Sequence, residues 1–103
     1  MTEQQIIETL ATKVMGWHKA EFNGAERWYK ECGNPAERIN WNPLQNIADA
    51  WMLVDKLKEQ EISTELHADD GEYIVRVNYD RWFSNKAAPK AICTAMFEYA
   101  TQL

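Results

Sequence analysis

The sequence predicts an α+β domain with an antiparallel sheet, in the element order α-β-β-α-β-β-α. Three stretches carry apolar residues at helical spacing, and between them lie two segments in which extended strands flank a tight-turn signal. Helices and hairpins in this order are typical of the α+β class. With 103 residues, of which 46% are hydrophobic, the whole chain 1–103 is expected to form a single domain around one core.

The first helix is expected over residues 3–15. Thr2 and Gln5 have the Thr-x-x-Gln spacing of a capping box, in which each side chain satisfies a free N–H group at the helix start. Apolar side chains follow at helical spacing. Gly16 then predicts the end of the helix, because glycine commonly follows the last turn.

Two hairpins are predicted by their turn residues. Asn23-Gly24 is a strong signal for a two-residue turn, and Asp69-Asp70-Gly71 is a turn in which the glycine can take a positive φ. The expected strands are residues 17–22 and 25–30 for the first hairpin, and residues 62–68 and 73–79 for the second. A further short strand is expected at residues 38–41, and loops are expected at residues 32–35 and 80–86.

The central helix is expected to begin at Asn46, whose side chain can accept from the free N–H groups of the first turn. Asp49 is expected on the solvent side, where a carboxylate near the N-terminus is favoured by the helix dipole. Trp41 and Trp51 are expected to pack together in the core, the alternative being that Trp41 stays partly exposed as a stacking surface. The positions predicted to form the apolar face are Ile47, Ala50, Trp51, Val54 and Leu57.

The last helix is expected to begin near Pro89, since proline is favoured in a first helical turn. It has two apolar faces. A helix that is apolar on two sides must be buried on two sides, and one small sheet cannot cover both. A second helix or a second subunit is therefore expected against it, and the second subunit would make a homodimer. The two faces are Ile92, Met96, Tyr99 and Leu103, and Cys93, Phe97 and Ala100.

Three separated motifs resemble a known family, the phage ABA sandwich domain. They follow one another in the family's order and span almost the whole chain. The resemblance implies an antiparallel sheet sandwiched by helices and a phage or prophage origin, and it implies no catalytic residues. The motifs are Val14-Met15-Gly16-Trp17, then Trp41-Asn42-Pro43 with Ile47-Ala48-Asp49-Ala50-Trp51, and finally Ala88-Pro89-Lys90-Ala91-Ile92-Cys93-Thr94-Ala95.

The composition argues against several classes of protein. The net charge of −5 disfavours direct binding to nucleic acid, whose backbone is itself negative. The sequence has no apolar run long enough to span a membrane and no signal-peptide pattern at its start, so a membrane protein is not expected. Two cysteines without CxxC spacing indicate a reducing compartment, which predicts a location in the cytoplasm of a host cell.

An enzyme is also not expected. His18 and His67 lie outside any metal-ligand spacing. Cys93 reads as a small core residue, and Cys32 lies in a polar loop without an adjacent histidine that would activate it as a nucleophile. The sequence contains no glycine-rich phosphate loop and no hydrolase or metalloprotease motif. We therefore expect no catalytic residue, no metal site and no cofactor.

One group of side chains on the second predicted hairpin could bind a ligand. Alternation places polar side chains on one strand face: Glu65, His67, Arg76 and Asn78, followed by Arg81 and Trp82. A guanidinium suits a phosphate and an indole suits a base, so this face could hold a nucleotide. The alternative is that opposite charges on neighbouring strands only stabilise the sheet. The possible ligand-binding residues are Arg76, Arg81, Trp82 and His67.

Three functions are compatible with these features. The first is a non-enzymatic phage accessory protein that binds and antagonises a host protein, an antiviral-defence component such as a CRISPR effector. The acidic side chains proposed for this contact are Glu26, Glu31 and Glu37. The second is a sponge that sequesters a nucleotide signal through Arg76 or Arg81. The third is a structural or regulatory homodimer.

Overall fold

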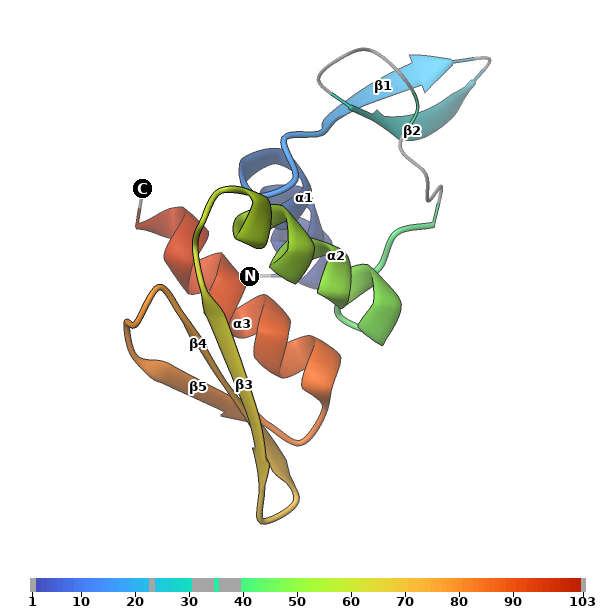
Figure 1. Ribbon diagram of the computed structural model, residues 1–103. Coiled ribbons are helices and arrows are strands. Elements are labelled where there is room, and N and C mark those ends of the chain that lie inside the picture. The colour runs from blue at the N-terminus through green and yellow to red at the C-terminus, as the bar shows by residue number, and fades with distance from the viewer. Residues whose placement is uncertain (1, 23, 31–34, 36–39, 103) are drawn as a thin grey trace.

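The computed structural model describes residues 2–22, 24–30, 35 and 40–102 (Figure 1). Over these residues the element order is α-β-β-α-β-β-β-α, and all strand pairs are antiparallel. The predicted α+β class is confirmed. The elements are α1 (Glu3–Lys13), β1 (His18–Phe22), β2 (Ala25–Tyr29), α2 (Ile47–Glu59), β3 (Thr64–Asp69), β4 (Glu72–Val77), β5 (Trp82–Asn85) and α3 (Ala88–Thr101).

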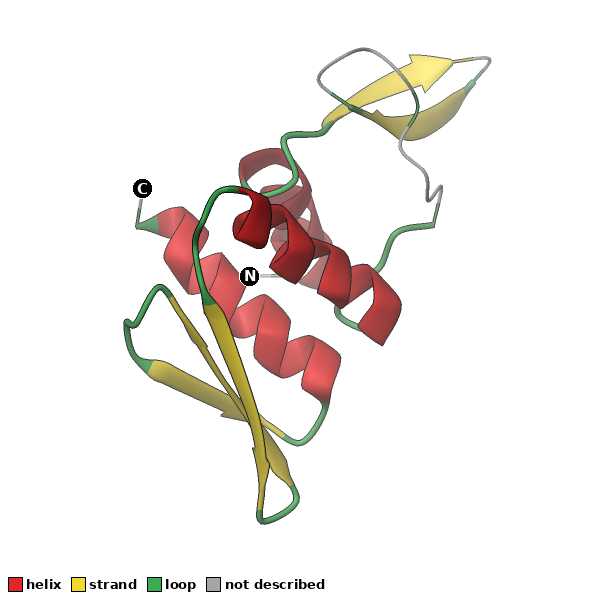
Figure 2. Cartoon of the chain, in the orientation of Figure 1, coloured by secondary structure: helices red, strands yellow, loops and turns green. Residues whose placement is uncertain are grey.

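Helix α3 is the central layer of the fold. One side of α3 packs on strands β4 and β5, and the other contacts α1 and α2 (Figure 2). The strands form two separate sheets, a two-stranded sheet β1-β2 and a three-stranded sheet β3-β4-β5. The β1–β2 hairpin projects beyond α1, at the opposite end of the molecule from the three-stranded sheet (Figure 1).

Within the described residues, both apolar faces of α3 are covered by the chain itself; Leu103, predicted on one of them, lies outside these residues. Buried side chains occur around the helix, including Ala91, Ile92, Cys93 and Met96. Helices α1 and α2 supply the second cover that the sequence requires, so of the two alternatives a second helix is the one observed. The homodimer hypothesis thereby loses the argument that was based on this helix.

The helix starts follow the predicted capping chemistry. The capping box is formed: Gln5 N donates to Thr2 Oγ1 over 3.2 Å, and Thr2 N donates to Gln5 Oε1 over 2.9 Å. Asn46 caps α2, because its Oδ1 accepts from the backbone N–H of Asp49 over 3.1 Å. Both predicted start positions are confirmed.

The predicted orientation of α2 is wrong for Ile47, Asp49 and Trp51 in its first two turns. Asp49 is only 1% exposed, whereas Ile47 is 48% and Trp51 45% exposed. The reason lies in the segment before the helix, where the backbone N–H of Asn42 needs an acceptor. Asp49 Oδ2 provides it over 2.9 Å, which rotates the carboxylate inward and Ile47 outward.

Trp41 belongs to the core, as predicted, but its partner is not Trp51. Trp41 is 4% exposed and packs edge-to-face on Trp17, with ring centroids 5.1 Å apart. Its Nε1 donates to the backbone carbonyl of Asp49 over 3.3 Å. Burial excludes the alternative in which Trp41 is a stacking surface for a ligand.

The segment predicted to be a loop at residues 80–86 contains strand β5. It pairs with β4 from Tyr73↔Asn85 to Arg76↔Trp82. The chain reverses through Asn78 and Tyr79, which have φ of 54° and 58°, a left-handed conformation that sequence patterns assign to glycine. A four-residue strand after a turn without Gly or Pro gives almost no periodic signal, which explains the missed strand.

The remaining predictions concern the region between β2 and α2. Pro35 forms an isolated bridge with Tyr29, whereas residues 32–34 and 38–39 lie outside the described residues. Asn40 and Trp41, which end the short strand predicted at 38–41, are not in a strand.

Candidate functional site

The three-stranded sheet has two chemically different faces. Its register places Val75, Val77 and Phe83 on the side that packs against α3. On the opposite side the pairs Glu65↔Arg76, His67↔Ile74 and Arg76↔Trp82 bring polar and aromatic side chains together. This second side, which we call the open face, is where alternation in the sequence predicted a binding surface.

Arg76 is at the centre of the open face. Its Nε and Nη2 lie 3.2 and 2.6 Å from Glu65 Oε2, so the guanidinium and carboxylate form a salt bridge. The guanidinium carbon is 4.4 Å from the centroid of the Trp82 ring and 5.8 Å from that of Tyr79, within cation–π range. The centroid of the His67 ring lies 5.3 Å from that of the Trp82 ring. We call these five residues the Trp82 cluster.

The Trp82 cluster is accessible from solvent. Trp82 is 41% and Tyr79 70% exposed. Beside the indole is a shallow hollow of about 640 Å³, lined by His67, Ala68, Asp69, Ile74 and Trp82. The hollow therefore has an apolar and aromatic wall with a carboxylate at its rim, which favours an apolar or cationic group more than a phosphate.

The structure brings three of the four predicted ligand-binding residues together and separates the fourth. His67, Arg76 and Trp82 share the open face. Arg81 instead forms a salt bridge with Glu98 of α3, in which Arg81 Nη2 and Glu98 Oε2 are 3.2 Å apart. Its guanidinium carbon lies 5.1 Å from the centroid of the Phe83 ring. Arg81 therefore turns toward the helix side of the sheet, away from the hollow.

Tyr79 is a member of the cluster that the sequence did not identify. Alternation along β4 assigns it to the same face as Val75 and Val77. The left-handed turn at Asn78 and Tyr79 breaks this alternation and carries the Tyr79 ring over Arg76. A positive φ at two residues that are not glycine leaves no reliable sequence signal.

The predicted acidic surface is only partly within the described residues, because Glu31 and Glu37 lie outside them. Glu26 is already paired: its Oε2 is 3.3 Å from Lys19 Nζ, which also contacts Glu8 Oε1 at 2.8 Å. The hydrogen bond from Lys19 lowers the pKa of Glu8, and the same bond raises the pKa of Lys19. Glu26 is thus partly neutralised by its neighbour.

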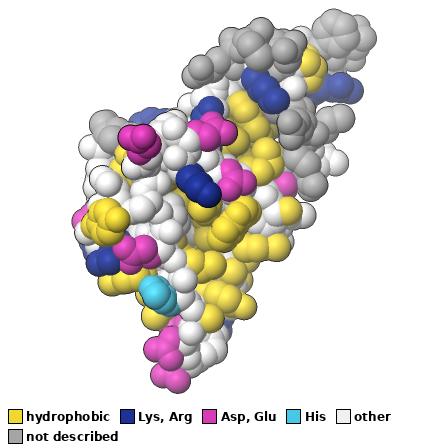
Figure 3. Space-filling model, in the orientation of Figure 1, with side chains coloured by type: hydrophobic (Ala, Val, Ile, Leu, Met, Phe, Trp, Pro, Cys, Tyr) yellow, Lys and Arg dark blue, Asp and Glu magenta, His cyan; other side chains and the backbone are white. Residues whose placement is uncertain are grey.

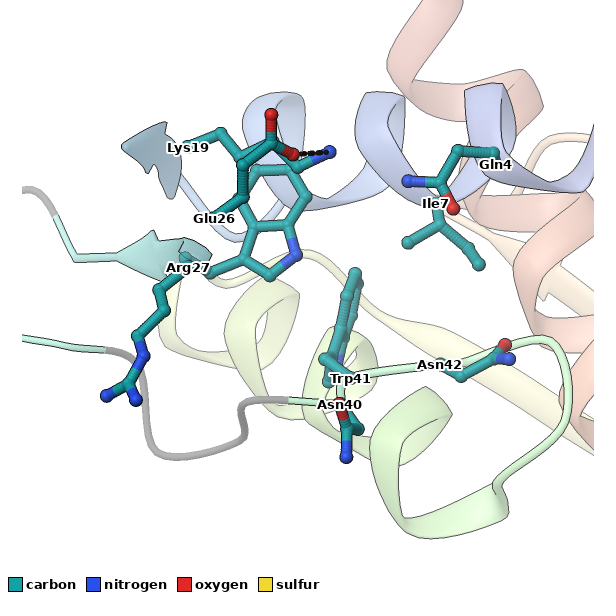
Figure 4. A pocket seen from close by; sticks show the side chains of 9 residues that line it. Gln4, Ile7, Lys19, Glu26, Arg27, Asn40, Trp41 and Asn42 are labelled. Atoms are coloured by element: carbon teal, nitrogen blue, oxygen red, sulfur yellow. Dashed lines mark ion pairs between the residues drawn. The ribbon is translucent and has the colours of Figure 1, made fainter. Parts of the chain in front are cut away.

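A second hollow, of about 300 Å³, lies between α1, the β1–β2 hairpin and residues 40–42 (Figure 4). Trp28 and Trp41 line it and are both largely buried. Lys19 stands over the Trp28 ring with Nζ 5.4 Å from the centroid, and its charge is balanced by two carboxylates. This hollow is a packing gap with a polar rim, and it lacks the exposed aromatic side chain that the open face presents.

The described residues also restrict the chemistry of the protein. They contain no group of three His, Cys, Asp or Glu side chains that could hold a metal ion. Cys93 is buried, and desolvation raises the pKa of its thiol to about 12, so the thiolate needed for nucleophilic attack does not form near neutral pH. In the same part of the chain, no helix has the length and hydropathy needed to cross a membrane.

Helix α2 presents a further exposed apolar surface, made of Ile47 and Trp51 one turn apart. Figure 3 shows hydrophobic side chains gathered over this helix in the view of Figure 1. Trp51 is as exposed as Trp82, but no ring or guanidinium contact is recorded for it among the described residues. It therefore serves as a reference for an exposed tryptophan on which no described residue stacks a guanidinium.

A comparison with known protein families completes the description of the site. The phage ABA sandwich domain family matches residues 8–97, which is most of the chain. The chain belongs to this family, as the three sequence motifs indicated. No curated protein and no solved structure matches the chain.

Proposed function

We propose that this phage-family protein is a non-enzymatic accessory protein that acts by binding a host protein through the open face of its three-stranded sheet. The observation that carries the proposal is the Trp82 cluster. An exposed tryptophan and tyrosine stacked about an arginine form the residue combination most enriched in the energetic centres of protein interfaces.

The geometry of Arg76 makes this surface suitable for tight binding. Its guanidinium is held by Glu65 at 2.6 Å and stacked on Trp82 at 4.4 Å before any partner arrives. Ordering a long side chain on binding costs about 0.5–1.5 kcal/mol, and a side chain that is already ordered avoids most of that cost. The same contacts hold the indole in a fixed orientation beside the hollow.

The class of partner that we propose is a component of host antiviral defence, such as a CRISPR effector. The phage family supplies the biological setting. The net charge of −5 favours a basic partner, and nucleases that bind nucleic acid have basic surfaces. Asp69 at the rim of the hollow places negative charge on the proposed contact surface, while the charge of Glu65 is balanced by Arg76.

The proposal predicts that Trp82→Ala strongly weakens partner binding and Trp51→Ala does not. Both substitutions remove a tryptophan of similar exposure, 41% and 45%, but only Trp82 belongs to the cluster. Removing a central interface tryptophan costs about 2 kcal/mol or more, so we expect Kd to rise by at least about thirtyfold. Affinity capture from host lysate, followed by titration of the captured protein by interferometry, measures the effect.

The same variants can be tested for anti-defence activity. Phage plating is compared on a host with an active CRISPR nuclease and on its isogenic deletion strain, each expressing the wild-type protein or one variant. We expect the wild type and Trp51→Ala to raise plating on the defended strain alone, and Trp82→Ala to have no effect. Equal behaviour of the two tryptophan variants, in binding or in plating, would overturn the role of the open face.

A nucleotide sponge is the second candidate, because the hollow of about 640 Å³ beside Trp82 is large enough for a small ligand. It is less well supported, since a phosphate would compete with Glu65 for Arg76 and would face Asp69 at the rim. Arg81, the other proposed phosphate ligand, pairs with Glu98 on the far side of the sheet. Native mass spectrometry of gently purified protein would reveal a retained nucleotide as an added mass.

A further inference from the structure

Strand β3 is an edge of the three-stranded sheet, and no strand among the described residues pairs with its outer side. In the order β3-β4-β5, β3 pairs with β4 on one side, and Leu66 through Asp69 are exposed. Proteins protect sheet edges with lysine, proline or very short strands. The other edge, β5, has only four residues and lies between Arg81 and Lys86, whereas the six residues of β3 include neither lysine nor proline.

The hydrogen-bond pattern shows which backbone groups are available at this edge. Asn78 N donates to Ser63 O over 2.9 Å, and these residues lie opposite one another, next to the pair Thr64↔Val77. Alternate residues of an antiparallel strand bond to the same neighbour, so Glu65, His67 and Asp69 bond to β4. The backbone N–H and C=O groups of Thr64, Leu66 and Ala68 therefore point outward from the sheet.

A second copy of the same strand can pair with these outward groups in few registers. When Leu66 lies opposite Leu66 of the other copy, Thr64 lies opposite Ala68. In this register every residue whose backbone groups point outward faces another such residue, so all of them can form hydrogen bonds across the pair. Glu65 then lies opposite His67 twice, which places a carboxylate beside an imidazole. Shifting the register by two residues in one direction places Glu65 opposite Glu65, and in the other direction it places Glu65 opposite Asp69. Like charges directly opposite are destabilising.

We infer that two copies of this chain pair antiparallel through β3, with Leu66 on the two-fold axis, to form a continuous six-stranded sheet. The pairing covers the exposed Leu66 side chain, 37% accessible in one copy, with its equivalent in the other. Side-chain alternation continues across the new pair, so both Trp82 clusters lie on one face of the sheet. The inference does not depend on the proposed function, because it rests on the backbone groups at the β3 edge and needs no host partner. Glu65 and His67, which select the register, also belong to the Trp82 cluster.

The mass in solution tests this inference. The chain has a mass of 12.0 kDa, and light scattering after gel filtration should give twice that value at micromolar and higher concentration. Leu66→Lys should give the monomer mass, because two charges would meet on the axis at a desolvated edge. The matched control is Ser84→Lys on the other edge strand, which should remain a dimer. Circular dichroism checks that both variants are folded.

A pair of variants at one position tests the register. His67→Lys places a cation opposite Glu65 of the other copy and should preserve the dimer, whereas His67→Glu places two carboxylates together and should raise the dimer Kd at least about tenfold. In a Cys32→Ser background, Leu66→Cys should form a covalent dimer under mild oxidation, since Cα atoms of a bonded antiparallel pair lie about 5.5 Å apart. Ser84→Cys should not.

Three results would overturn the inference. A wild-type monomer at all concentrations would exclude the dimer. This result would also be expected if β3 instead pairs with a strand of a different protein. A dimer that survives Leu66→Lys would use another surface. A covalent dimer from Ser84→Cys and none from Leu66→Cys would assign the contact to β5. In each case the Trp82→Ala binding test remains interpretable, because Trp82 is outside the β3 edge.

Discussion

Asp49 links the start of α2 to the chain segment that precedes it. Its Oδ2 accepts from the backbone N–H of Asn42, and its carbonyl accepts from the indole of Trp41. Its own N–H is capped by Asn46. Because Trp41 packs on Trp17, these contacts connect the helix start to the end of α1 through one buried residue.

Asp49→Ala should lower the free energy of unfolding by about 1–3 kcal/mol. The substitution leaves the partly buried N–H of Asn42 without its acceptor, and an unsatisfied buried donor costs that much. Urea denaturation followed by circular dichroism measures the change. Asp49→Asn keeps an oxygen that can accept from Asn42 and should lose less.

Asp55→Ala is the matched control on the same helix. Asp55 is exposed, so its removal should change stability by no more than about 0.5 kcal/mol. If Asp49→Ala were as mild as Asp55→Ala, the hydrogen bond to Asn42 would not contribute to stability.

At the scale of single residues, helix capping could be predicted from the sequence because it involves only neighbouring residues. The Thr2–Gln5 box and the Asn46 cap depend on residues within one turn, so their types and spacing were sufficient. The inward face of α2 was not predictable in this way. Ala50, Leu53 and Leu57 are buried and Val54 packs partly against them, whereas Ile47 and Trp51 are exposed. This orientation is favoured by the bond from Asn42, which lies outside the helix.

The hairpin between β3 and β4 is the element that presents both the open face and the β3 edge. Its turn residues Asp70 and Gly71 have φ of 48° and 76°, the left-handed pair that matches the twist of two-residue hairpins. A Cβ added at Gly71 would meet nothing within 4 Å, so a side chain here would be disfavoured by the backbone conformation alone.

Gly71→Ala should therefore destabilise the protein by about 1–2 kcal/mol, the cost of a left-handed conformation for an L-residue. Gly71→Asn should cost less, because asparagine tolerates this conformation better. Thermal unfolding monitored by circular dichroism gives the comparison. Equal losses for Ala and Asn would contradict a backbone origin of the effect.

The same element shows how much of the candidate site was accessible from the sequence. Period-two alternation was sufficient to place Glu65, His67 and Arg76 on one face. It could not place Arg81 or Tyr79, because the chain reverses at a turn of non-glycine residues and β5 is only four residues long. The backbone conformation of a turn that is fixed by tertiary packing cannot be predicted from the preferences of its own residues.

At the scale of the whole molecule, the position of α3 between two layers makes Cys93 a reporter of global opening. The side chain is fully buried, and burial raises the pKa of its thiol from 9.0 to about 12. Reaction with Ellman's reagent requires the exposed thiolate. The packing of α3 against both the sheet and the other helices thus protects the thiol in two ways: it keeps the reagent away from the sulfur, and it suppresses formation of the thiolate.

In a Cys32→Ser background, the native protein at pH 8 should react with Ellman's reagent only at the rate at which the fold opens. Because the folded pKa lies above the unfolded value of 9.0, stability from this group is present below that value and falls as pH rises above it. Mild urea should accelerate the reaction in parallel with unfolding. Immediate stoichiometric reaction in native buffer would contradict burial of α3 between two layers.

The central position of α3 also has a consequence for how the protein is made. Every element that α3 contacts, including α1, α2, β4 and β5, precedes it in the chain. While residues 88–101 are still within the ribosome, the emerging helices and hairpins have no partner for their apolar sides. The core can close only after α3 has emerged, and until then the apolar sides and the edge of β3 are exposed to aggregation.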